Sequence, residues 1–166
     1  MALAEAQYLP TARPTKPADS GATMQLVVFE IGPQRYALPV DLVREVVALP
    51  ALLELAGAAV GLCGLLNRRG TYVAVIDGRM MVGLPHAASL DSQVLLAGAA
   101  HPEVGLLVDR VTGVEQLAVS QSTSLDRRSV GTFLDQVVST ADGPILLLYF
   151  PALLALTPAL DRSTQL

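Results

Sequence analysis

The residues whose chemistry might carry a function are few, and two arginines are the most suggestive. Arg68 and Arg69 stand side by side where an apolar segment ends and Gly70 follows. Arginine presents a planar fork of donors, and such forks on a rigid corner form recognition surfaces. The alternative is that both arginines only keep the turn soluble. Their type and spacing leave both interpretations open.

The histidines and the cysteine form no motif for metal binding or nucleophilic catalysis. His86 and His101 stand singly, each next to a proline, and are expected in exposed loops. Cys63 is the sole cysteine, which excludes an intrachain disulfide and a multi-cysteine metal site. Its apolar and glycine neighbours predict a small buried hydrophobe. We therefore expect neither a metal nor a cofactor.

The acidic residues lie at the ends of predicted elements, where carboxylates cap helices or satisfy turns. They are Asp41, Glu45, Asp77, Asp91, Glu103 and Asp109. Asp77 is expected to be the N-cap of a short helix, and Asp109 to cap a turn or pair with an arginine. The sequence has no Gly-x-Ser-x-Gly motif and no phosphate-binding loop with its lysine. A catalytic carboxylate dyad is a minor alternative, and we expect no enzyme.

Composition limits the remaining classes of fold and function. The 166 residues are 52% hydrophobic and 16% charged, which suits one domain or two small lobes with a shared core. A net charge of −4 argues against nucleic-acid binding. Residues 143–160 lack charge, but Pro144, Pro151 and Pro158 would break a spanning helix. This segment predicts a buried strand and a short helix. Residues 1–23 lack the pattern of a secretory signal.

Many short apolar segments between tight turns predict an all-β fold, and a weak internal echo favours two barrel-like lobes. Strands are expected over 25–31, 35–38, 62–66, 72–76, 93–97, 104–108, 111–117, 133–139 and 145–149. Short helices are expected over 40–47, 78–82 and 151–156, and a loop over 120–129. The proline-rich residues 1–23 predict a disordered tail, and residues 158–166 a flexible end.

Several segments carry a recognisable pattern in their order along the chain: Phe29-Glu-Ile-Gly32, Tyr36-Ala-Leu-Pro39, Val43-Arg-Glu45-Val46, Gly64-Leu-Leu-Asn67-Arg68-Arg69-Gly70 continuing to Asp77, and Gly105-Leu-Leu-Val-Asp109-Arg-Val111 with Val114. In this order they resemble the CheW family of adaptor proteins in bacterial chemosensory arrays. The resemblance covers about Gln25 to Leu156. It implies that residues 24–157 form two intertwined five-stranded SH3-like β-barrels with a groove between them.

The resemblance also implies a function and a site. It implies a non-catalytic cytoplasmic adaptor that links chemoreceptor signalling tips to a CheA-type histidine kinase, without nucleic-acid binding or membrane insertion. The receptor-facing positions would be Val43, Glu45 and Arg69. The signature hairpin would contribute Asn67, Arg68, Gly70 and Asp77. Two alternatives stay open: an adaptor of a pilus-motility or other chemosensory pathway, and a barrel that binds a small molecule.

Three positions depart from the family pattern. Arg68 and Gly78 each stand where the family usually has Leu, and Tyr149 stands where it usually has Asp. Arg68 adds a positive charge at the hairpin corner. Glu45 is expected to select a basic partner or to orient Arg69; a purely structural ion pair between Glu45 and Arg69 is the alternative.

Overall fold

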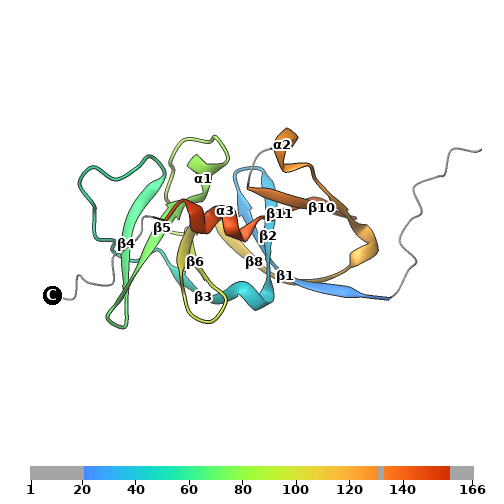
Figure 1. Ribbon diagram of the computed structural model, residues 1–166, viewed down its shortest axis with the longest axis horizontal. Helices are drawn as coiled ribbons and strands as arrows, with labels where there is room; N and C mark the ends of the chain where they lie inside the picture. The colour runs from blue at the N-terminus through green and yellow to red at the C-terminus, as the bar shows by residue number, and fades with distance from the viewer. Residues whose placement is uncertain (1–20, 131–132, 158–166) are drawn as a thin grey trace, which may run out of the picture.

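A computed structural model describes residues 21–130 and 133–157, which fold into two sheets that form two lobes side by side (Figure 1). The expected C-terminal end, 158–166, and residues 1–20 of the expected tail lie outside the described residues. Both sheets are built largely from antiparallel neighbours, and each contains one parallel pair, β2 with β11 and β5 with β7. The all-β prediction is confirmed.

The six-stranded sheet forms what we call the terminal lobe, because its strands come from both ends of the described chain. The order is β8-β1-β2-β11-β10-β9. Its strands are β1 (Thr23–Ile31), β2 (Gln34–Pro39), β8 (Arg110–Ala118), β9 (Ser122–Ser124), β10 (Leu134–Thr140) and β11 (Gly143–Leu148). The three-residue β9 is the strand beyond the five expected, and it lies in the segment expected to be a loop.

The five-stranded sheet forms the central lobe, which is inserted between the two halves of the terminal lobe in the chain order. Its order is β3-β6-β7-β5-β4. The strands are β3 (Val43–Ala48), β4 (Leu62–Arg68), β5 (Thr71–Asp77), β6 (Gln93–Ala97) and β7 (Val104–Val108). The chain therefore enters the terminal lobe, crosses to the central lobe and returns, which makes the two lobes intertwined.

In the described residues, five short helical segments connect or cover the strands. They are η1 (Val40–Leu42), α1 (Gly78–Met81), η2 (Val119–Gln121), α2 (Arg127–Val130) and α3 (Phe150–Ala155). The helix expected over 40–47 is wrong beyond its first turn, because Val43–Ala48 is a strand that pairs with β6. β-branched valines favour an extended backbone, and the pairing with β6 satisfies it. The uncharged segment folds through residue 157 as β11 followed by α3, as expected.

The two lobes share one hydrophobic core. The core includes Val27, Phe29 and Ile31 of β1, Leu95 of β6 and Leu106 of β7, and α3 adds buried side chains to it. The opposite face of β1 lies in a core internal to the terminal lobe, and the opposite face of β6 in a core internal to the central lobe. These strands are buried on both faces, which explains their continuous apolar sequences.

Within 21–130 and 133–157, no helix is long and apolar enough to cross a membrane.

Because the core is shared, we expect damage to it to reach both lobes. Ile31 is fully buried in it. Ile31→Ala should lower the free energy of unfolding by about 2–5 kcal/mol, and amide-exchange protection should fall in β6 and β7 as well as in β1. Ile145→Ala, which removes the same group from the terminal lobe's internal core, is the matched control. Loss of protection confined to the terminal lobe in Ile31→Ala would contradict a shared core.

Candidate functional site

The corner between β4 and β5 is a tight two-residue turn. Arg68 pairs with Thr71, so that Arg69 and Gly70 alone make the connection. Both have left-handed backbones, with φ of 52° at Arg69 and 83° at Gly70. Positive φ at both positions matches a type I′ turn, whose twist fits a β-hairpin. The Gly70 amide donates to Asn67 Oδ1 at 3.0 Å, which fixes the corner further.

The next element of the site is a β-bulge in β3. Val43 pairs with Ala97 and Glu45 pairs with Leu96, so Arg44 is an extra residue on this strand. The bulge lets both Val43 and Val46 pack against the shared core. It also presents Arg44 and Glu45 together on the neighbouring surface. A bulge re-aims side chains in this way, and no simple alternation in the sequence reports it.

The hairpin corner, the β3 bulge and the turn between β6 and β7 surround a groove of about 530 Å³, which we call the arginine groove. Its lining residues are Arg44, Glu45, Arg68, Arg69, Thr71, Val73, His101 and Pro102. The structure thus brings together Glu45 and Arg69, two of the three expected receptor-facing residues, and adds Arg68. Val43 is not among the lining residues, because its half-buried side chain packs against the shared core.

Glu45 pairs with Arg68 rather than with Arg69. Arg68 Nε donates to Glu45 Oε2 at 2.8 Å, and a second bond joins Arg68 Nη2 to Glu45 Oε1. The alternative of a structural ion pair between Glu45 and Arg69 is therefore wrong. Arg68 is the last residue of β4, whereas Arg69 lies in the left-handed turn beyond it, so the two neighbours have different roles. Both side chains of the pair are about one third exposed, at 32% and 34%.

Asp77 lies far from this corner, at the opposite end of β5, about 20 Å away at the rise of a β-strand. As expected, it is the N-cap of α1: Oδ1 accepts from the amides of Arg79 at 2.9 Å and of Met80 at 3.4 Å. Its other oxygen bonds to His86 Nδ1. His86 is exposed as expected, but it does not stand singly. The signature hairpin therefore has an arginine-bearing corner at one end and, at the other, a capping end where Asp77 begins α1.

With this geometry in place, comparison with known proteins identifies the family. The model of the CheW-like domain matches residues 25–157. The chain belongs to the CheW-like domain family. It is 27% identical over 104 residues to the chemotaxis protein CheW of Thermotoga maritima, covering 63% of this chain and 69% of that protein. It is 28% identical over 91 residues to the chemotaxis protein CheW of Bacillus subtilis, covering 54% and 58%.

A solved structure agrees with the CheW-like fold. The scaffolding protein TtCheW of Thermoanaerobacter tengcongensis superposes with a TM-score of 0.70 at 22% identity, covering 77% of this chain and 90% of that one. The family and the fold expected from the sequence are both confirmed.

Two of this CheW-like chain's departures from the family pattern have a visible structural setting, Gly78 at the start of α1 and Tyr149 before α3. A Cβ at Gly78 would lie 2.5 Å from the Leu107 carbonyl oxygen and 2.8 Å from Ile31 Cδ1, so the close contact between lobes requires glycine. The side chain of Tyr149 does not cap α3. Its ring instead packs under Arg127, whose guanidinium lies 3.8 Å from the ring centre. Tyr149 therefore has a packing role here.

Asp109 joins the two lobes. Its Oδ2 accepts from the Gly32 amide at 2.7 Å, in the turn between β1 and β2. Its carboxylate also accepts two bonds from Arg79 of α1, Nε to Oδ1 at 2.7 Å and Nη2 to Oδ2 at 2.8 Å. The bond to Asp109 raises the pKa of Arg79. Both roles expected for Asp109, turn cap and arginine partner, occur together.

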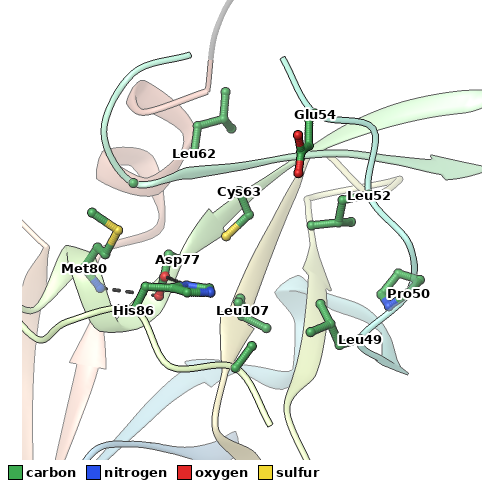
Figure 2. A pocket seen from close by; sticks show the side chains of 12 residues that line it. Leu49, Pro50, Leu52, Glu54, Leu62, Cys63, Asp77, Met80, His86 and Leu107 are labelled. Carbon is green, nitrogen blue, oxygen red and sulfur yellow. Dashed lines mark hydrogen bonds and ion pairs between the residues drawn. The ribbon is translucent and has the colours of Figure 1, made fainter. Parts of the chain in front are cut away.

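A second pocket, of about 340 Å³, adjoins the capping end of the hairpin (Figure 2). In Figure 2 the Asp77 carboxylate and the His86 imidazole point toward each other, and Cys63 lies near them in a lining that includes four leucines. Burial, and secondarily the charge of Asp77, raise the pKa of the Cys63 thiol to about 11. The thiol is therefore neutral near pH 7 and packs as a small hydrophobe. In the part of the chain that the structure describes, no group of three or more potential ligands is placed to hold a metal.

The Glu45–Arg68 pair can be measured by double-mutant cycles. We expect a coupling free energy of about 0.5–1 kcal/mol between Glu45→Ala and Arg68→Ala in urea unfolding, because the pair is bidentate but partly exposed. The cycle of Glu45→Ala with Arg69→Ala is the matched control and should show none. A larger coupling in the Arg69 cycle would contradict the pairing seen here.

The Cys63 thiol should give a defined pH dependence. Its pKa is raised from an ordinary value near 9 to about 11, so the unfolded chain loses this proton at a lower pH than the folded one. The stabilising contribution is complete below about pH 9 and is lost as the pH rises toward about 11. Urea unfolding from pH 8 to 11, compared with Cys63→Ala, checks this. The contribution is absent if both proteins lose stability in parallel.

Proposed function

We propose that this CheW-like chain is a non-catalytic cytoplasmic adaptor that couples the signalling tips of chemoreceptors to a CheA-type histidine kinase. The family match over residues 25–157 and the chemotaxis and scaffolding names of its relatives support the class of function. The observation that carries the site is the arginine groove. It joins Glu45 and Arg69, which the family resemblance marked as receptor-facing, around one concave surface.

The groove has the physical features that a helical partner requires. A helix binds to a groove through apolar contact and a few polar selectors. The partly exposed Pro102 supplies apolar surface, Val73 beside it is almost fully buried, and the charged residues of the rim supply selectivity. The type I′ turn and the bulge hold these residues on rigid strands. Binding therefore costs little conformational entropy. Val43 supports the groove indirectly. Its packing on the shared core anchors the bulge that presents Arg44 and Glu45.

An adaptor also needs a second surface for the kinase, and the intertwined lobes provide a stiff body between two surfaces. We propose that the kinase binds near the central hairpin and its flanks, at a surface that does not include the Arg69 corner. A pilus-motility or other chemosensory pathway would use the same surfaces and differ only in the identity of the receptor and the kinase.

The pocket beside Asp77 is the observation that favours the other alternative, a small-molecule-binding barrel. Its leucine-rich wall would suit an apolar ligand. However, both oxygens of the Asp77 carboxylate already accept hydrogen bonds, from two amides and from His86. The buried Asp77 carboxylate thus has its hydrogen-bond partners within the fold and is not free to bind a ligand. The adaptor function has the stronger support.

A pulldown tests the adaptor proposal. The purified protein should retain CheA-like kinases and receptor-tip fragments encoded in its own genome. Arg69→Ala should lose most of the receptor fragment, by roughly tenfold in affinity, while the kinase stays bound and the melting temperature hardly changes. Arg110→Ala, a similarly exposed arginine paired with Glu30 in the terminal lobe, is the matched control.

The outcome separates the alternatives. If the wild-type protein retains neither partner, the adaptor function is wrong, and ligand binding at the pocket beside Asp77 becomes the leading hypothesis. If Arg69→Ala and Arg110→Ala behave alike, the receptor-facing role of the corner is wrong.

A further inference from the structure

The arginine groove carries an excess of positive charge that the fold does not neutralise. Its charged lining residues are three arginines and one glutamate, Arg44, Arg68, Arg69 and Glu45. Together they leave two positive charges. The protein as a whole has a net charge of −4, so this groove is a local exception to an acidic surface.

The hydrogen bonds show which arginines remain available. Both Glu45 oxygens are engaged by Arg68, one by its Nε and the other by its Nη2. The six ion pairs within residues 21–130 and 133–157 include neither Arg44 nor Arg69. Both of these arginines are exposed. Arg68 is thus paired within the protein. The guanidinium groups of Arg44 and Arg69 remain available to bind a partner.

The backbone position of each free arginine is fixed by a local structural feature. Arg44 is the extra residue of the β3 bulge, and Arg69 occupies the first position of the type I′ turn. The Glu45–Arg68 pair lies between these two elements and ties β3 to the end of β4. Guanidinium groups so anchored bind carboxylates through paired hydrogen bonds more specifically than a lysine would.

We infer that the arginine groove takes an acidic segment of its protein partner, one that presents at least two carboxylates on one face. Arg44 and Arg69 are the specificity-determining residues, and Arg68 is a positioning residue that neutralises Glu45 and holds the two strands together. The inference rests on the proposed function, because the segment is assigned to the receptor tip. It reverses the sequence-based expectation that Glu45 selects a basic partner.

The charge distribution also explains why the groove would be specific for an acidic partner segment. The acidic body of the protein repels an acidic partner at long range, so attraction at this groove comes from its two free arginines. Complementary charge of this kind contributes more to specificity than to overall affinity. It also makes the binding sensitive to salt.

The test is a titration of the receptor-tip fragment that binds in the pulldown, at low and at high salt. Arg44→Gln and Arg69→Gln should each weaken binding roughly tenfold, and the double variant should lose most of the salt dependence. Glu45→Gln, which removes the one carboxylate of the groove, should tighten binding by roughly threefold. Arg110→Gln, in the terminal lobe, is the matched change of charge and should bind as the wild type does.

A second set of variants lies on the partner. Receptor fragments in which single Glu or Asp residues become Gln or Asn should include at least one that loses binding to the wild type but not to the double arginine variant. Thermal melting confirms that every variant is folded.

The outcomes distinguish this inference from the function on which it rests. If no receptor fragment binds the wild type, the proposed function fails. If a fragment binds but the arginine variants bind equally well, the function stands and the acidic-segment inference is overturned. It is likewise overturned if Glu45→Gln weakens binding as much as Arg69→Gln does, because the partner would then be basic at this contact. Equal weakening by Arg110→Gln would reduce the effect to overall charge and overturn it as well.

Discussion

The burial of single strands on both faces is the constraint on which the rest of this structure depends. β1 contributes Phe29 to the shared core and Val28 to the core of the terminal lobe, and β6 divides Leu95 and Leu96 in the same way between the shared core and that of the central lobe. Neither sheet can be covered without the other, so the lobes behave as one body. A partner that binds to the central lobe therefore meets a surface whose position relative to the terminal lobe is fixed.

Carboxylates secure the junction that this core creates. Asp109 bonds to the turn between β1 and β2 and to α1, and Asp77 caps α1 from the end of β5. Gly78 lets the first residue of that helix approach both Leu107 and Ile31. Asp77 and Asp109 thus serve the architecture. This leaves the exposed chemistry of the described chain concentrated at the other end of the central hairpin, where the proposed recognition takes place.

Two adjacent arginines with the same chemistry have different roles because the backbone changes between them. Arg68 ends a strand and pairs with Glu45, whereas Arg69 occupies a left-handed turn position and has no acidic partner within the described chain. Substitution of the family's usual Leu by Arg68 therefore changes the groove indirectly. It removes Glu45 from the set of free charges, which turns a mixed surface into a cationic one. In this view a single departure from the family pattern alters the kind of partner segment that fits.

The sequence by itself determined the family, the all-β class, most strands, the hairpin with its glycine and the capping role of Asp77, because these features are local: they depend on β-branched content, turn residues and the position of a carboxylate before a helix. It failed where pairing between distant segments decides. The helix expected over 40–47 became a strand because β6 offers it hydrogen bonds, and the β3 bulge appears only in that register. The partner of Glu45 likewise depended on the meeting of β3 with the end of β4, about 23 residues apart in the chain. Tertiary structure alone decided these points, because a side chain's neighbour across a sheet is set by strand register rather than by the residues beside it in sequence.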